Sequence, residues 1–134
     1  MTQQIYTVLP FVLEGSDHEF PLVVRLGFRS DHPYEMSMEL LAGPGDRICW
    51  TFARDLLLVG RHRSWGEGDV RIWPQRLPGS GRVWIRLRAD GGRCALSLGA
   101  ADVDDWCRRM TDLVPHGSEQ DHFDLDEQLR LFLA

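Results

Sequence analysis

The sequence predicts an α+β fold with seven mainly antiparallel strands, a short helix after the fourth strand and two helices at the C-terminal end. Three observations support this prediction. Apolar and polar residues alternate with a period of two through the first two-thirds of the 134 residues. The dipeptide Asp90-Gly91 is typical of a tight hairpin. In the last third, apolar residues recur instead at helical spacing, which favours helices packed on one side of a sheet.

The first four strands are expected at residues 5–13, 20–28, 34–40 and 47–52, separated by turns rich in glycine, proline, serine and aspartate. Residues 5–13 are apolar on both faces and include Pro10, which has no N–H to donate to a neighbouring strand. The segment is therefore predicted to be an edge strand or a bulged one. An apolar edge needs a cover, and a partner subunit is one such cover.

The last three strands are expected at residues 69–73, 82–88 and 94–98. The hairpin at Asp90-Gly91 predicts three cross-strand pairs: Arg88 with Arg93, Arg86 with Ala95, and Trp84 with Ser97. Pairing of the preceding two strands across Pro78-Gly79 predicts two more: Trp73 with Trp84, and Asp69 with Arg88.

Three helices complete the prediction. The first covers residues 54–59, with Gly60 as its C-terminal stop. The second covers residues 102–114, with aspartates in its first turn and a stripe of apolar residues: Val103, Trp106, Cys107, Met110, Leu113 and Val114. The third begins at Asp124, where Glu127 completes a capping box. Its expected buried face is Leu125, Leu129, Phe132 and Leu133.

Length and composition indicate one globular domain over residues 1–134. The hydrophobic share of 43% and the charged share of 26% exclude a disordered chain, a coiled coil and a fibrous repeat. No apolar run approaches the roughly 18 residues of a membrane span, and the first residues carry no secretory signal. Three scattered cysteines, Cys49, Cys94 and Cys107, predict buried free thiols in a reducing compartment.

The net charge of −5 conceals an asymmetry along the chain. Residues 61–93 carry eight arginines and three acids, whereas the segments before and after have net charges of −4 and −6. All fifteen basic residues of the chain are arginines. A basic middle segment is suited to phosphate, to an acidic protein or to the acidic ends of neighbouring subunits.

No catalytic or cofactor-binding motif is present in the sequence, neither a nucleophile elbow, nor a P-loop, nor a zinc-protease helix, nor a dinucleotide fingerprint. Two acidic clusters resemble cation ligands, at residues 122–126 and 102–105. Helix starts account for both clusters, because carboxylates favour the first turn. The sequence therefore predicts a protein without enzymatic activity, cofactor or metal.

One strand carries arginine and tryptophan on a single face, and its expected neighbour adds more of the same. The predicted face comprises Asp69, Arg71, Trp73, Arg82, Trp84, Arg86 and Arg88. Three interpretations remain open. A helix or a neighbouring subunit covers the face, another protein binds it, or single-stranded nucleic acid stacks on it.

Four segments resemble one known family: Asp31-His32-Pro33-Tyr34, residues 52–57 (FARDLL), residues 68–74 (GDVRIWP) and residues 122–126 (HFDLD). Together they are similar to the SsgA-like sporulation and cell division proteins over almost the whole chain. The motif positions are Arg54, Asp55, Asp69, Arg71, Trp73, Pro74, Phe123 and Asp124. Structural roles are the expectation for several of them, since Pro74 would end a strand and Asp124 would cap a helix.

The resemblance implies a small cytoplasmic actinobacterial protein without catalytic activity that acts in sporulation-linked division and cell-wall remodelling at septa. One member of the family, together with an SsgA-type paralogue, places the tubulin-like protein FtsZ at future septa. The family fold is a homotrimer whose subunit resembles the Whirly single-stranded nucleic-acid-binding proteins. The implied partners are a second and third copy of the chain, FtsZ and the paralogue, with nucleic acid as the alternative and no membrane insertion.

Overall fold

The computed structural model describes residues 2–15, 18–43, 45–75, 81–89, 91–122 and 125–133. Within these ranges the strands are β1 (Gln4–Glu14), β2 (Glu19–Arg29), β3 (Glu35–Gly43), β4 (Asp46–Ala53), β5 (Trp65–Glu67), β6 (Val70–Pro74), β7 (Arg82–Ala89) and β8 (Gly92–Gly99). The helices are α1 (Arg54–Gly60), α2 (Ala100–Leu113) and α3 (Leu125–Leu133), with a 3₁₀ turn η1 at Glu119–Asp121.

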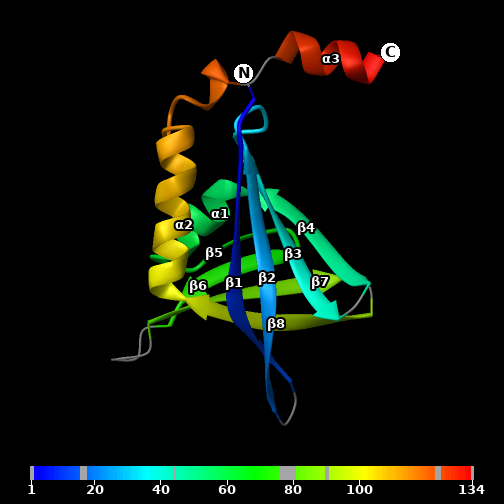
Figure 1. Cartoon of the computed structure of the whole chain (residues 1–134), viewed down its shortest axis with the longest axis vertical. Coiled ribbons are helices and arrows are strands. Elements are labelled where there is room, and N and C mark those ends of the chain that lie inside the picture. The colour runs from blue at the N-terminus through cyan, green and yellow to red at the C-terminus, as the bar shows by residue number, and fades with distance from the viewer. Residues whose placement is uncertain are drawn as a thin grey trace.

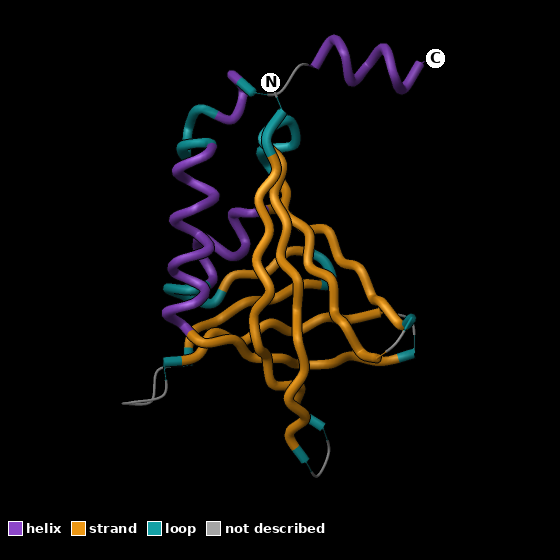
Figure 2. Tube along the Cα trace, viewed as in Figure 1, coloured by secondary structure: helices purple, strands orange, loops and turns teal. Residues whose placement is uncertain are grey.

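All eight strands form one antiparallel sheet in the order β4-β3-β2-β1-β8-β7-β6-β5. The sheet is strongly twisted, so that β1 to β4 run along the molecule while β6 to β8 run across it (Figure 1 and Figure 2). The α+β class is confirmed, but the predicted number of seven strands is wrong. The missed strand, β5, has only three residues, all exposed, and so shows no alternation for a sequence pattern to detect.

The first strand, predicted to be an edge strand or a bulged one, lies instead inside the strand order, between β2 and β8, and its register with β2 is continuous. It pairs along its whole length with β2 and, over residues 11–14, also with β8. Over residues 4–10 it has a described strand on one side only, and Tyr6 and Val8 on its outer face are 45% and 57% exposed, so the apolar outer face marks this half as an uncovered edge. Pro10 lies just before the ladder with β8 begins, at Phe11, which is where a residue without an N–H is tolerated.

The core lies on one face of the sheet and is closed by α1 and α2. Helix α2 packs against β1, β7 and β8, while α1 packs against β3 to β6. The alternation predicted from the sequence is confirmed over residues 24–28 of β2, 36–40 of β3, 70–72 of β6 and 83–87 of β7, where every second residue is buried, but not on β4, where Ile48 is 52% exposed. The buried strand residues include Val24, Leu26, Phe28, Met36, Met38, Leu40, Val70, Ile72, Val83, Ile85, Leu87, Leu96 and Leu98.

Helix α1 lies where the sequence places it, but Gly60 has a different role. It is the last residue of the helix and has no positive φ, so it is not a left-handed stop. A Cβ at this position would lie 2.5 Å from the Cβ of Ile72. Glycine is therefore needed here because α1 lies directly on β6.

Helix α2 buries Val103, Trp106, Cys107 and Met110, as its stripe predicts. Helix α3 does not follow the prediction of a buried face. Leu129, Phe132 and Leu133 are 47%, 86% and 78% exposed. The physical reason is its position, since α3 stands beyond the end of the sheet with no element beside it (Figure 1). The side chain of Leu125 and the residues Phe123 and Asp124 lie outside the described part of the chain.

The three cysteines are free, but only one is buried. Cys107 lies in the core under α2, Cys94 is partly buried, and Cys49 is exposed on the edge strand β4. The prediction of three buried thiols is therefore correct for Cys107, only partly correct for Cys94 and wrong for Cys49. Cys49 lies on an edge strand and points to the outer face of the sheet.

Candidate interaction face on the outer side of the sheet

The predicted arginine and tryptophan face is the outer side of β6, β7 and β8, opposite the core. The buried residues of β7 alternate with half-buried Trp84 and Arg86. On β6, exposed Arg71 separates buried Val70 and Ile72. The predicted hairpin register is confirmed, including Trp73 opposite Trp84. Asp69 lies opposite Arg88, whose backbone N–H donates to the Asp69 carbonyl at 2.9 Å.

The two tryptophans stack on each other across neighbouring strands. The ring centroids of Trp73 and Trp84 are 6.3 Å apart, and their planes differ by 10°. The indole Nε1 of Trp84 donates to Gln75 Oε1 at 2.8 Å. The pair is therefore a fixed, half-buried element of the outer face, with Trp84 further constrained by its polar partner.

The guanidinium of Arg82 is hydrogen-bonded within the sheet, so we do not count it among the arginines available to a partner. Its guanidinium donates to the Ser97 hydroxyl and, at 2.8 Å, to the Ser97 carbonyl. Ser97 is the cross-strand neighbour of Trp84 on β8 and is buried. The arginine thus supplies a partner to a buried hydroxyl on the strand beside Trp84.

Four other arginines form what we call the arginine track: Arg71, Arg86, Arg88 and Arg93. Arg71 lies directly opposite Arg86, and Arg88 directly opposite Arg93. In the described ranges, no carboxylate lies within 4.0 Å of any of the four guanidinium groups. Like charges directly opposite each other destabilise a sheet. The track is therefore an electrostatic cost to the fold that no described ion pair compensates. Arg93 belongs to it although the sequence-based site did not include it.

Three adjoining depressions follow the track and share its side chains. The largest, of about 580 Å³, is lined by Ser64, Arg71, Trp73, Pro74, Gln75 and Arg86. The second, of about 140 Å³, adds Glu67, Asp69 and Arg88 to Arg71 and Arg86. The third, of about 360 Å³, is lined by Arg88, Ala89, Gly92 and Arg93. Because each shares an arginine with the next, they form one continuous basic surface with tryptophan at one end.

Arg54, the arginine of the FARDLL segment, lies instead in the interior. It is 1% exposed and donates to three acceptors: the Val114 carbonyl at 2.8 Å, the Met110 carbonyl at 3.4 Å and Glu119 Oε1 at 2.8 Å. Its guanidinium carbon also lies 5.2 Å from the centre of the Phe28 ring. Arg54 therefore caps the C-terminal end of α2, where a cation is favoured.

Glu119 is the buried partner that sequence reasoning missed. Burial alone would raise its pKa, but hydrogen bonds from Arg54 and from the Gly117 N–H, together with the charge of Arg54, hold the pKa below its ordinary value. No local pattern marks this residue, because it follows a turn and lies 65 positions from Arg54. Only an expectation that a buried arginine needs a carboxylate could have directed attention to it.

The remaining motif positions have peripheral or structural places. Asp55 is exposed at the start of α1, with His116 Nε2 3.6 Å from its carboxylate. Pro74 ends β6, as predicted, and also lines the largest depression. The expected cap at Asp124 and its neighbour Phe123 fall outside the described residues.

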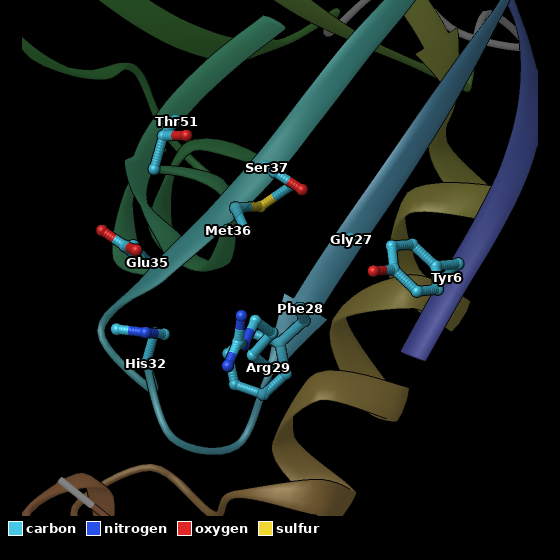
Figure 3. A pocket seen from close by; sticks show the side chains of 9 residues that line it. All are labelled: Tyr6, Gly27, Phe28, Arg29, His32, Glu35, Met36, Ser37 and Thr51. Carbon is cyan, nitrogen blue, oxygen red and sulfur yellow. The ribbon is translucent and has the colours of Figure 1, made fainter. Parts of the chain in front are cut away.

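A separate, small depression of about 100 Å³ lies near the turn that carries Asp31 and His32. Figure 3 shows its lining side chains, with Tyr6 beside Gly27 and with Arg29 and His32 at the turn. A Cβ on Gly27 would lie 2.6 Å from the Ser37 hydroxyl and 3.0 Å from the Tyr6 ring. The glycine therefore lets the tyrosine ring cover the sheet. The volume is below the roughly 300 Å³ at which small-molecule sites begin.

Across the described residues, no group of three or more histidines, cysteines, aspartates or glutamates is placed to hold a metal ion. Among the described helices, none has the length and apolar character needed to cross a membrane.

The chain is similar in sequence and in structure to known proteins. The family described as "Streptomyces sporulation and cell division protein, SsgA" matches residues 22–119. The chain belongs to this family. It is 38% identical over 120 residues to the sporulation-specific cell division protein SsgB of Streptomyces coelicolor, covering 90% of this chain and 88% of that one. It is also 38% identical over 114 residues to SsgB of Thermobifida fusca, covering 85% and 83%. The chain is therefore an SsgB-like member of the SsgA family.

Solved structures of the family share the fold. The SsgA-like sporulation-specific cell division protein of Thermobifida fusca superimposes with a TM-score of 0.86 at 34% identity, over 97% of this chain and 96% of that one. A structure of SsgB from Streptomyces coelicolor gives 0.85 at 34% identity, over 92% and 98%. The latter was described with mutations that correlate with longitudinal cell division during sporulation. A role in cell division follows from the family.

Proposed function

We propose that this chain is a non-enzymatic, sporulation-specific division protein that acts through protein–protein contacts in septum placement, by recruiting FtsZ, and in remodelling the cell wall. The observation that carries the proposal is the arginine track with its stacked tryptophans, on the outer face of a sheet whose family acts in cell division. Arginine and tryptophan are the residues that most often anchor protein partners. The proposed location is the cytoplasm at division septa.

Recruitment can be tested with purified proteins and in the host. The chain is incubated with assembled FtsZ filaments, pelleted, and quantified in pellet and supernatant. In parallel, the gene is deleted and complemented, and septa per spore-forming filament are counted. We expect co-sedimentation with FtsZ and loss of regular septa in the deletion strain. Absence of co-sedimentation together with normal septation would refute the proposal.

We also propose self-association into a homotrimer, consistent with one domain over residues 1–134 and a Whirly-like subunit. Support comes from apolar surface that nothing in the described monomer covers. On α3, Leu131, Phe132 and Leu133 are exposed, as are Tyr6 and Val8 on the outer face of β1. Exposed apolar patches of this kind mark contact surfaces. Light scattering after gel filtration tests the state, and Phe132→Ser is expected to reduce the trimer mass toward that of a monomer.

The second candidate function is binding of single-stranded nucleic acid, favoured by the net charge of +5 over residues 61–93. Release of counterions from phosphate would make such binding fall steeply with salt. Binding of an oligonucleotide that decreases with salt and is lost in Trp84→Ala would support this candidate. Affinity capture from the sporulating host, with and without nuclease, separates it from the division proposal.

A further inference from the structure

We propose that the arginine track is a docking surface for an acidic peptide segment of a partner protein, with an apolar side chain of that segment seated on Trp73 and Pro74. The inference rests on the proposed function, because it assigns one surface and one ligand chemistry to the protein–protein contacts.

The four arginines of the track form two pairs of like charges. Arg71 opposes Arg86 and Arg88 opposes Arg93, so two like-charge pairs adjoin along three strands. Within the described chain none of these guanidinium groups has a carboxylate partner within 4.0 Å. A guanidinium fork binds a carboxylate with two parallel hydrogen bonds. Carboxylates spaced along an extended peptide would relieve both pairs at once.

The middle of the track favours a peptide over a nucleic acid. Glu67 and Asp69 line the depression between Arg71 and Arg88. A nucleic-acid strand carries a negative charge at every nucleotide and would meet these carboxylates. A peptide can place a neutral or basic residue there and still offer carboxylates on either side. The acids therefore act as a selectivity element against a uniform polyanion.

The arrangement of the two tryptophans also favours a peptide over a nucleic acid. Bases bind single-strand platforms by stacking on exposed ring faces. Here Trp73 and Trp84 have nearly parallel rings with centroids 6.3 Å apart, so part of one face of each ring is turned toward the other. What remains beside Arg71 is an apolar wall formed by Trp73 and Pro74 in the largest depression. This wall suits a single apolar side chain in a segment that is otherwise acidic.

Fluorescence anisotropy with the full-length protein tests the proposal. The probes are a fluorescein-labelled peptide with two tetraglutamate blocks separated by two glycines, the same peptide with one of these glycines replaced by leucine, and an oligothymidylate of equal charge. The track variant is Arg71→Gln/Arg86→Gln. Its matched control is Arg47→Gln/Arg108→Gln, which makes the same change in net charge at exposed arginines of β4 and α2.

We expect both peptides to bind the wild type, the leucine-containing peptide more tightly, and the oligothymidylate more weakly than either. The track variant should bind the peptides at least about tenfold more weakly, since a charged hydrogen bond to each arginine is lost. The control should bind as the wild type does. Thermal unfolding by circular dichroism verifies folding, and the track variant should be no less stable than the wild type.

Three results would overturn the proposal. One is equal loss of peptide binding in the track variant and its control, which would indicate attraction by net charge alone. Another is tighter binding of the oligothymidylate with loss in the track variant, which would make the surface a nucleic-acid site. The third is absence of peptide binding to wild-type protein in its assembled form, as when a second copy covers the track.

The FtsZ sedimentation assay separates this inference from the proposed function. If the track variant co-sediments with FtsZ as well as its control does, the division function stands and the assigned surface is wrong. If the peptides bind the track but the wild type does not recruit FtsZ, the surface stands and the proposed function fails.

Discussion

Arg54 and Arg86 are both arginines of the same sheet-and-helix body, yet their surroundings are opposite. Arg54 is buried, and its guanidinium donates to two backbone carbonyls and to Glu119. Arg86 lies on the outer face, directly opposite Arg71, with no carboxylate within 4.0 Å in the described part of the chain. The first arrangement satisfies a charge that folding has removed from water. The second leaves charges available and retains their mutual repulsion.

This difference separates a structural position, Arg54, from the arginines that we propose to contact a partner. A buried ion pair contributes little net stability compared with an apolar core, but removal of one partner is costly because a desolvated charge remains. An exposed like-charge pair has the reverse property, since removal of one partner relieves the fold. Stability measurements can therefore distinguish the two groups without knowledge of the ligand.

The largest effect is expected at the buried cluster. Arg54→Ala leaves the Glu119 carboxylate and the last carbonyls of α2 without their donor, and should reduce the free energy of unfolding by about 3–5 kcal/mol. Urea titration followed by circular dichroism measures it. Arg47→Ala is the control, because Arg47 is exposed where it pairs with half-buried Glu39, and its loss should change stability by less than about 1 kcal/mol. A change at Arg54 as small as that of the control would contradict the structural role.

The pH dependence of stability tests the role of Glu119 in the same buried cluster. Because the pKa of Glu119 is lowered in the folded state, its stabilising contribution is complete above the ordinary value of 4.5 and is lost as the pH falls through the folded value. The urea midpoint of the wild type should therefore fall below about pH 4.5 more steeply than that of Glu119→Gln.

Asp31 provides the comparison for this titration, since a hydrogen bond from Arg29 lowers its pKa at the surface. Replacement by asparagine should change the acid limb of the stability curve less than Glu119→Gln does, because exposed pairs contribute little. Parallel acid limbs for the wild type and Glu119→Gln would show that the buried carboxylate does not titrate as proposed.

A smaller effect of opposite sign is expected on the outer face. Arg86→Gln removes one member of the Arg71–Arg86 pair and should raise the free energy of unfolding by about 0.2–1 kcal/mol. The measurement is urea unfolding at low ionic strength, where repulsion is least screened. The gain should shrink as salt is added, and a loss of stability at low salt would mean that the side chain has an attractive partner.

The smallest effect concerns thiol labelling in the native state. Burial raises the pKa of Cys107 to about 11, so its thiolate is scarce and shielded, whereas Cys49 is exposed on β4. A disulfide reagent followed by mass spectrometry should modify Cys49 and leave Cys107 intact. In Arg54→Lys, loosening of the end of α2 should accelerate labelling of Cys107 while leaving Cys49 unchanged. Equal acceleration at both cysteines would indicate global unfolding instead.

Sequence patterns predicted much of the fold because they report on local geometry. Alternation located seven strands, a helical stripe located α2, and the Asp90-Gly91 turn set the register that brings Trp84 opposite Ser97. Sequence patterns failed where the position or exposure of an element depends on elements far away in the chain. The position of β1 in the sheet depends on β8, which follows more than 70 residues later along the chain. The exposure of α3 depends on what lies beside it, which amphipathicity cannot specify.

The candidate site divides in the same way. The sequence by itself determined which residues share the outer face of β6 and β7, because a period of two and a turn fix side and register. Only the tertiary structure decided which arginines are free. Arg82 donates to Ser97 and Arg54 donates to Glu119, 65 residues away, whereas the pairing of Arg88 with Arg93 follows from the predicted hairpin. The physical reason is that the identity of a charged group's partner depends on long-range packing, whereas the direction of its side chain depends on its own strand.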